Sequence, residues 1–297
     1  MTAKLAYADG ESLQATYPPG IRWDIDIPDN STPLKLIDAT IEKYADKDAL
    51  DFMGRKITYR ELGRMINDTA RGLTAQGIGP GTKLGLHMPN SPYFLVLQLA
   101  AWRAGATVVP YSVLDKNKEK MKNQIADSGT TIMATLDLND FYTPVTDLLE
   151  QGALKQIIRC PLLDALPDEK GRPAKFIRKL PAPIKDAVLF IMGRFPPLRH
   201  KAEELKQLYA KLAPPLQDDP RIIPFDALQK PGKNTPVTEA EAGDTALLQY
   251  TSGTTGTLKA AVLTQFNLAA NSMQVSEFFR APSAVKPGEA LMEPGRE

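Results

Sequence analysis

The chain has 297 residues, 43% hydrophobic and 24% charged, which provides enough apolar side chains for one large domain or two ordinary ones. Its 36 basic and 35 acidic residues leave a net charge of +1, which argues against a general polyanion binder, so we expect no nucleic-acid partner. The single cysteine, Cys160, excludes a disulfide framework and a cysteine-cluster metal site.

The N-terminus has neither a signal-peptide pattern nor a continuous apolar stretch. The densest apolar run, Tyr93–Trp102, is about half of the roughly 20 residues that a bilayer span requires, so we predict a buried helix there. We therefore expect a cytoplasmic protein.

The first elements are predicted from caps and turns. Residues 1–30 are polar and proline-rich and are expected to form an arm with little regular structure. A helix should begin at Pro33 behind a Ser or Thr cap. A short hairpin is predicted around Gly54, and the spacing of Thr58 and Glu61 predicts a capping box at the start of the next helix.

Strands and helices then alternate with short connections. Strands are predicted at residues 83–87, 107–110, 131–135, 156–159, 222–223 and 246–250, and helices at about 92–104, 116–127 and 144–150. This alternation is typical of an α/β fold with a mostly parallel sheet and helices on its faces.

Residues 162–220 break the alternation and are predicted to be a basic, proline-rich insertion. Between residues 169 and 211 the segment carries eleven basic side chains and four acidic ones. A helix over 198–212 would place a set of apolar side chains on one face: Leu198, Leu205, Leu208, Tyr209 and Leu212. Two interpretations stay open: a solvated helical hairpin over its own core, or peripheral contact of residues 170–211 with an anionic membrane such as the inner membrane.

One motif carries chemistry. The sequence YTSGTTGTLK, residues 250–259, follows an apolar strand. Glycines let backbone amides approach a phosphate, hydroxyls donate to phosphate oxygens or complete a magnesium shell, and lysine supplies positive charge. The spacing differs from a Walker A loop, because two residues separate Gly256 from Lys259 and a strand is predicted to follow. A strand–loop–strand hairpin is therefore predicted.

The longer string YTSGTTGTLKAAVLTQFNL resembles the phosphate-loop signature of the adenylate-forming (AMP-binding) superfamily: TSGTTG, one variable residue, Pro-Lys-Gly, then Thr-His-x-Asn. The resemblance covers about residues 30–160 and 220–280, and the start YPPGIRW looks closest to bacterial long-chain fatty acid or dicarboxylate CoA ligases. Three positions depart from the pattern. Leu258 replaces Pro and should loosen the turn, Gln265 replaces His, and Ala260 replaces Gly, which costs little only where φ is negative.

The resemblance implies the N-terminal subdomains of the adenylate-forming fold: an arm at 1–30 and a truncated AMP-binding domain at 31–297, with the C-terminal domain absent. Family enzymes use ATP and Mg²⁺ to convert a carboxylic acid into an acyl-adenylate, and then transfer the acyl group to coenzyme A. The implied phosphate-binding residues are Thr251, Ser252, Gly253, Thr254, Thr255 and Gly256, with Lys259 supporting the loop and Thr251 contacting Mg²⁺.

The resemblance assigns no catalytic residue to this chain, because the family's remaining reactive groups are expected beyond residue 297. We therefore predict the N-terminal part of an acyl-CoA synthetase that is inactive alone. The alternative is a non-catalytic remnant that binds a nucleotide or associates with a membrane.

Overall fold

The computed structural model describes residues 21–22, 24–115, 117–168, 176, 180, 182–212, 219–230, 235–251 and 258–280. Most of the predicted N-terminal arm and the centre of the glycine-rich motif lie outside these residues. The division of the chain at residues 30, 162 and 220 stays a prediction.

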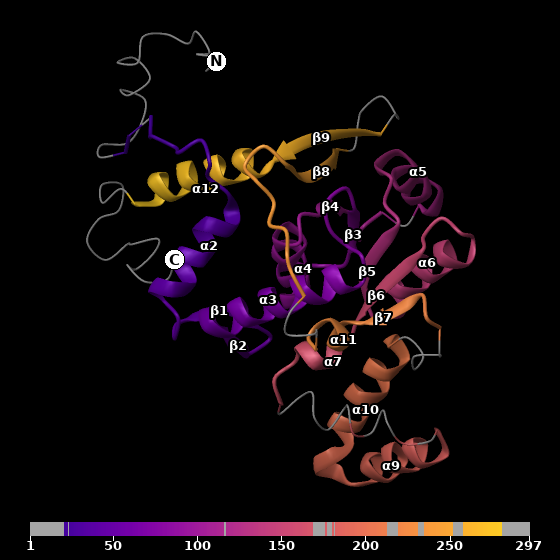
Figure 1. Cartoon of the computed structure of the whole chain (residues 1–297). Coiled ribbons are helices and arrows are strands. Elements are labelled where there is room, and N and C mark those ends of the chain that lie inside the picture. Colours follow the sequence, from indigo (N-terminus) through magenta and orange to yellow (C-terminus); the bar gives the residue numbers. More distant parts are fainter. Residues whose placement is uncertain are drawn as a thin grey trace.

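A seven-stranded sheet runs through the molecule in the order β7-β6-β5-β3-β4-β8-β9 (Figure 1). Every neighbouring pair is parallel except β8 and β9, which are antiparallel. The strands are β3 (Lys83–His87), β4 (Thr107–Pro110), β5 (Ile132–Leu136), β6 (Gln156–Cys160), β7 (Ile222–Pro224), β8 (Thr245–Thr251) and β9 (Lys259–Thr264). The predicted α/β class with a mostly parallel sheet is confirmed.

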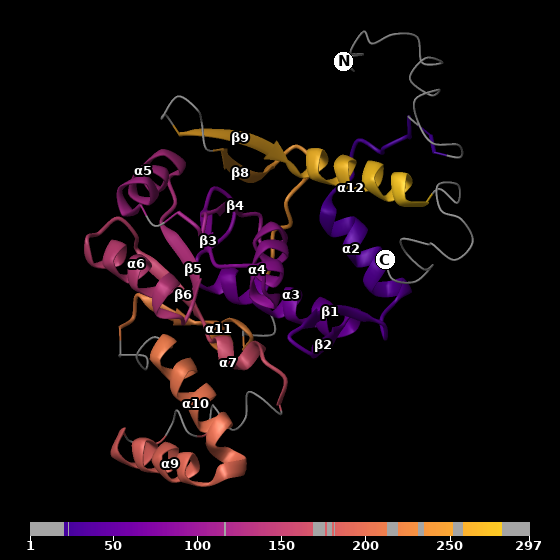
Figure 2. The same cartoon turned by 180° about the vertical axis from the view of Figure 1, so that it is seen from behind.

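Helices cover both faces of the sheet (Figures 1 and 2). The helices in the described part of the chain are α2 (Pro33–Lys43), α3 (Tyr59–Ala75), α4 (Pro92–Arg103), α5 (Lys118–Ser128), α6 (Asn139–Glu150), α7 (Leu162–Ala165), α9 (Ala182–Arg194), α10 (Pro196–Lys211), α11 (Phe225–Leu228) and α12 (Gln265–Arg280), of which α9 and α10 stand away from the sheet. A separate antiparallel hairpin, β1 (Asp48–Phe52) with β2 (Arg55–Thr58), forms around Gly54 as predicted. Within the described ranges, each helix is too short or too polar to cross a membrane.

The period-two alternation of β5 divides the core into two layers. Ile132, Ala134 and Leu136 face a cluster that includes residues of α3 and α4, while Met133 between them joins the cluster of α5 and α6. Side chains of a strand alternate between faces, so an apolar residue at every position is expected only where both faces are covered. This explains why four of the five residues of β5 are apolar and why the fifth, Thr135, is also buried.

The predicted helix caps form. The Thr32 hydroxyl accepts a hydrogen bond from the Lys35 amide at 3.2 Å, and the Thr58 hydroxyl accepts from the Glu61 amide at 3.2 Å. Each cap satisfies one of the amides that the first turn of a helix leaves unpaired. The Glu61 carboxylate also lies 3.6 Å from Arg55 Nη2 of β2, which ties the start of α3 to the β1–β2 hairpin.

Helix α6 begins five residues before the predicted start at Pro144. Proline favours the first turn of a helix, but here it lies inside α6. Tyr142 and Val145 are both buried in the core shared with α5, so packing extends the helix toward its N-terminus at the cost of one backbone hydrogen bond.

His87, at the end of β3, is 3% exposed, and its ring lies edge-on to the Phe141 ring with 6.1 Å between the ring centres. Burial lowers the pKa of His87 to about 4 from an ordinary value of 6.5. The native state therefore binds this proton less readily than the unfolded chain does. The free energy of unfolding should fall as the pH drops from 6.5 toward 4, by up to about 3 kcal/mol from this group.

Urea unfolding at pH 7 and pH 4.5 measures this effect. We expect a His87→Gln variant to lose less stability between the two pH values than the parent protein. His200→Gln is the matched control, because the His200 side chain is 90% exposed. Equal losses for the parent and His87→Gln would show that His87 does not drive the pH dependence.

Candidate functional site

The β8–β9 hairpin presents the glycine-rich motif at the carboxyl end of the parallel sheet. Strand β8 is held against the sheet by side chains from α4 and β4. Trp102 Nε1 donates to the Ala246 carbonyl at 2.8 Å, and the Thr107 hydroxyl donates to the Thr245 carbonyl at 2.9 Å. In open α/β sheets, ligands bind outside the carboxyl ends of the strands, so β8 carries its last residues to the expected place.

The stem of the hairpin brings together the two described residues of the predicted site. Thr251 ends β8, Lys259 begins β9, and the two are directly opposite each other in the antiparallel register. Opposed residues of an antiparallel pair have their side chains on the same face of the sheet. The predicted strand–loop–strand hairpin is therefore confirmed, while Ser252, Gly253, Thr254, Thr255 and Gly256 lie outside the described residues.

Two of the three departures from the family signature can be judged from the structure. Ala260 lies within β9 and, among described non-glycine residues, only Met53 has a positive φ, so alanine is tolerated there. Gln265 is fully buried at the start of α12, and neither side-chain amide atom has a hydrogen-bond partner among the described residues. Leu258 lies beside Thr251 on the wall of a pocket.

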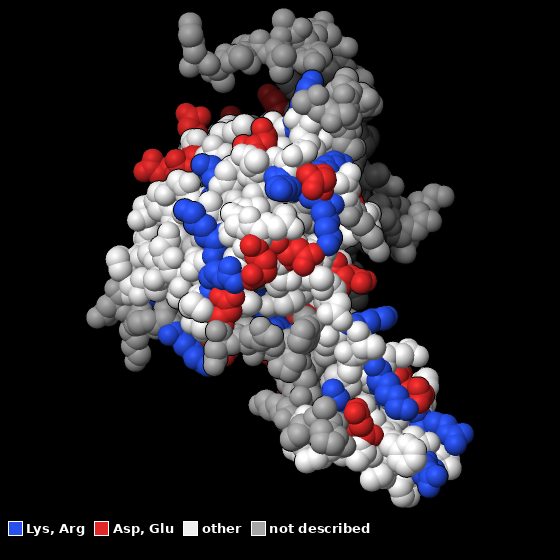
Figure 3. All heavy atoms as spheres, turned by 90° about the vertical axis from the view of Figure 1, so that its right-hand side faces the viewer, with Lys and Arg blue, Asp and Glu red and all other residues white. Residues whose placement is uncertain are grey.

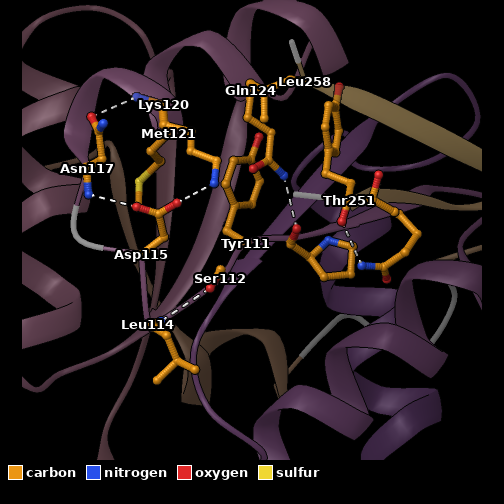
Figure 4. Close-up of a pocket in the computed structure, with 13 residues that line it drawn as sticks. Tyr111, Ser112, Leu114, Asp115, Asn117, Lys120, Met121, Gln124, Thr251 and Leu258 are labelled. Carbon is orange, nitrogen blue, oxygen red and sulfur yellow. Dashed lines mark hydrogen bonds and ion pairs between the residues drawn. The ribbon is translucent and has the colours of Figure 1, made fainter. Parts of the chain in front are cut away.

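This pocket has a volume of about 590 Å³ and opens beside the motif (Figure 4). Its walls come from the end of β4, the loop that follows, α5 and the stem of the β8–β9 hairpin. The lining includes Tyr111, Asp115, Lys120, Gln124, Gln249 and Thr251. Volumes between 300 and 1,000 Å³ are usual for small-molecule sites, so the pocket is large enough for part of a nucleotide.

Polar groups line one wall of the pocket. Lys120 Nζ lies 2.5 Å from Asp115 Oδ2, and Asp115 Oδ1 accepts from the Asn117 amide at 3.0 Å (Figure 4). The hydrogen bond from Lys120 lowers the pKa of the Asp115 carboxyl below its ordinary value. Gln124 Nε2 donates to the Pro110 carbonyl at 3.0 Å, which leaves its carbonyl oxygen as an acceptor.

Two tyrosines fix the pocket walls. The buried Tyr111 hydroxyl donates to Thr130 Oγ1 at 2.9 Å and lies 3.2 Å from Ser128 Oγ, and burial raises the pKa of Tyr111 to about 12. The Tyr250 hydroxyl donates to the Asp127 carboxylate of α5. Burial is the first cause, and Asp127 the second, that raises the pKa of Tyr250. This bond ties the stem of the motif to α5.

Sequence reasoning found Thr251 and Lys259 but missed the opposite wall. Asp115, Lys120 and Gln124 belong to no recognisable motif. Only their position in the chain could have indicated them, because they follow the carboxyl end of β4, the strand that pairs with β8. The residues present fit a Mg²⁺-bound polyphosphate: the Thr251 hydroxyl lines the pocket, and the Lys259 ammonium shares its face of the hairpin stem.

A mostly parallel sheet with helices on its faces, and a glycine- and hydroxyl-rich sequence between β8 and β9, places the chain among the α/β proteins. Comparison with known sequences is specific: the family described as AMP-binding enzyme matches residues 37–292. The chain belongs to this family.

Two relatives show how much of the family is present. The long-chain-fatty-acid–CoA ligase of Yersinia pestis is 27% identical over 285 residues, which cover 95% of this chain and 43% of that protein. The ligase of the same name from Bacillus subtilis is 25% identical over 258 residues, which cover 87% of this chain and 40% of that protein. The chain therefore spans less than half the length of these relatives.

Solved structures agree on the fold. A long-chain-fatty-acid–CoA ligase from Archaeoglobus fulgidus superimposes with a TM-score of 0.55 at 19% identity, covering 86% of this chain and 42% of that one. An anthranilate CoA ligase in complex with anthranoyl-AMP superimposes with a TM-score of 0.55 at 15% identity, covering 81% of this chain and 36% of that one.

Proposed function

We propose that this chain supplies the ATP-phosphate-binding part of an acyl-CoA ligase that activates a fatty or dicarboxylic acid. The observation that carries the proposal is the β8–β9 hairpin, whose stem holds Thr251 and Lys259 opposite each other in the register, with Thr251 lining a pocket of about 590 Å³. The names of the relatives, which are long-chain-fatty-acid–CoA ligases, support the same reaction.

In this proposal, residues 251–256 bind the β- and γ-phosphates of ATP and the Thr251 hydroxyl contacts Mg²⁺. Lys259, on the neighbouring strand, contributes positive charge to the phosphate side of the hairpin. Phosphate neutralisation and positioning are the protein's main contributions to such a reaction, because negative charge otherwise repels the attacking carboxylate. Coenzyme A would accept the acyl group in the intact enzyme.

Replacing Lys259 with alanine should weaken MgATP binding. A hydrogen bond to a charged group contributes about 1.5–3 kcal/mol, which corresponds to a loss of affinity of roughly 10- to 100-fold. Isothermal titration calorimetry measures it. Lys230→Ala is the control, because Lys230 is exposed on the loop after α11 and pairs with Asp226 at 3.1 Å, away from the pocket. Equal affinities for both variants would contradict the assignment of Lys259.

The same purified chain should catalyse no exchange of pyrophosphate into ATP when long-chain fatty acid is added. Its relatives are more than twice as long. We infer that the side chains that catalyse adenylate formation lie in the part of those relatives that this chain does not match. Fatty-acid-dependent exchange would show that this chain completes the first half-reaction alone.

A further inference from the structure

The helices α9 and α10 form a helical hairpin, residues 182–212, that stands away from the sheet (Figure 1). Its inner side has a core of its own, in which Leu189 and Met192 of α9 meet Leu205 and Leu208 of α10. Leu212 and Leu205 also join Leu163 of α7, so the hairpin is fixed to the body of the protein. The outward side chains of the hairpin are therefore not needed for its internal packing.

Those outward side chains include an apolar patch. Its five members have these exposed fractions: Phe190 60%, Phe195 56%, Ile191 54%, Ile184 50% and Leu198 42%. Ile184 and Ile191 are seven residues apart and Phe190 adjoins them, so they share the outer face of α9. Leu198 was predicted on one face with four other apolar residues of α10, but it lies in the first turn, is exposed, and is not part of the cluster that the other four join.

Basic side chains surround the apolar patch. The Arg194 guanidinium lies 5.0 Å from the centre of the Phe190 ring, and Arg199 Nε donates to the Gly193 carbonyl at 3.2 Å. Both arginines, with Lys201, are exposed and have no ion pair with a described carboxylate. Figure 3 shows the hairpin as a lobe that carries blue Lys and Arg spheres, fewer red Asp and Glu spheres, and white surface between them.

Two of the three acidic side chains of the hairpin, Glu203 and Glu204, have partners on α10, and the third, Asp186, is exposed. Glu203 lies 2.9 Å from Lys206, and Glu204 lies 3.3 Å from His200, both on α10. Asp186 is the one acidic residue of α9. The outward side of the hairpin therefore combines exposed aromatic and aliphatic side chains with Arg194 of α9 and Arg199 of α10, neither of which pairs with a described carboxylate, and the stretch 169–211 has eleven basic residues against four acidic ones.

We propose that this helical hairpin binds the protein peripherally to an anionic lipid bilayer. Ile184, Phe190 and Ile191 enter the boundary between headgroups and acyl chains, while Arg194 and Arg199 contact lipid phosphates. Apolar side chains on one face with cations beside them are the combination that surface-lying helices use, and anionic headgroups attract such cations. A protein partner would equally cover apolar side chains, but the excess of basic over acidic residues in the stretch 169–211 favours the phosphate-rich surface.

Vesicle co-sedimentation tests this proposal with the whole chain. The probes are vesicles of phosphatidylcholine alone and of phosphatidylcholine with about one third phosphatidylglycerol, each at low and high salt. We expect binding to the anionic vesicles only, weakened at high salt because screening reduces attraction between charges. Binding to neither kind of vesicle, or to both equally, would overturn the proposal.

Two sets of variants separate the roles of charge and apolar surface. The triple variant Arg194→Glu, Arg199→Glu, Lys201→Glu should lose at least about tenfold in vesicle affinity. The matched control changes the same number of exposed charges elsewhere, as Arg64→Glu, Lys155→Glu, Lys230→Glu, and should bind nearly as the parent does. Equal losses in the two triples would show a general charge effect and overturn the site.

The second set keeps all charges. Phe190→Ser with Ile191→Ser should weaken binding by about fivefold or more, since apolar burial contributes to the affinity of such helices. Unchanged binding would contradict insertion of α9. Circular dichroism and thermal unfolding check that each variant folds, and because all these side chains are exposed, we expect melting temperatures close to that of the parent.

Discussion

Replacing Asp137 with alanine is expected to lower the free energy of unfolding by about 3–5 kcal/mol. The Asp137 side chain is 1% exposed, and its Oδ2 lies 3.8 Å from Nη2 of Arg159, which is 4% exposed. Asp137 Oδ1 also accepts from the Leu162 amide at 2.7 Å. Alanine therefore leaves a buried guanidinium without its carboxylate and a backbone amide without its acceptor, both of which are costly in a low-dielectric interior.

Chemical denaturation followed by circular dichroism measures the change. Asp226→Ala is the control, because Asp226 also pairs with a cation, Lys230, but both side chains are exposed, and exposed pairs contribute less than about 1 kcal/mol. Combining Asp137→Ala with Arg159→Met should recover part of the loss, because the buried charge that the Asp137 carboxylate balanced is then removed. A loss below about 1 kcal/mol for Asp137→Ala would mean that the pair is not structurally important.

Replacing Gly72 with alanine should also destabilise the fold strongly. In most helices alanine is more favourable than glycine by about 1 kcal/mol. Gly72 of α3 lies against α11, where an added Cβ would come within 2.6 Å of Leu228 Cα and closer still to the Leu228 carbonyl oxygen. Because the obstacle is backbone, relief requires α11 to move, and we expect a loss of more than about 2 kcal/mol.

Gly193→Ala is the matched control, since a Cβ at this position of α9 would meet no atom within 4 Å. We expect that variant to be neutral or slightly stabilised in the same thermal unfolding experiment. If both substitutions shifted the melting temperature in the same direction, the close approach of α3 and α11 would be refuted.

Local signals in the sequence were sufficient to predict most of the sheet. Caps such as Thr32 and Thr58 depend on neighbouring residues alone, and the run that became β5 is apolar at four of its five positions, which marks a strand buried on both faces. The antiparallel β8–β9 pair was predictable because a short glycine-rich loop separates two apolar runs.

The errors arose where distant packing decided the outcome. The start of α6 depends on burial of Tyr142 against α5, which outweighs the preference of Pro144 for a first turn. Leu198 shares the apolar spacing of α10 but lies outside the cluster that contains Leu205 and Leu212, which the periodicity of α10 does not reveal. The polar wall of the pocket could not be predicted residue by residue, because Lys120 and Gln124 reach it only through the pairing of β4 with β8.

We propose that the loop between β8 and β9 binds the phosphates of ATP, and the affinities of the chain for ATP and for AMP test this proposal most directly. Both nucleotides share adenine, ribose and the α-phosphate, so the difference in affinity measures the contribution of the β- and γ-phosphates. In calorimetric titrations with Mg²⁺, we expect ATP to bind at least about tenfold more tightly than AMP, and Lys259→Ala to remove most of this preference. Equal affinities of the parent protein for ATP and AMP would contradict the account.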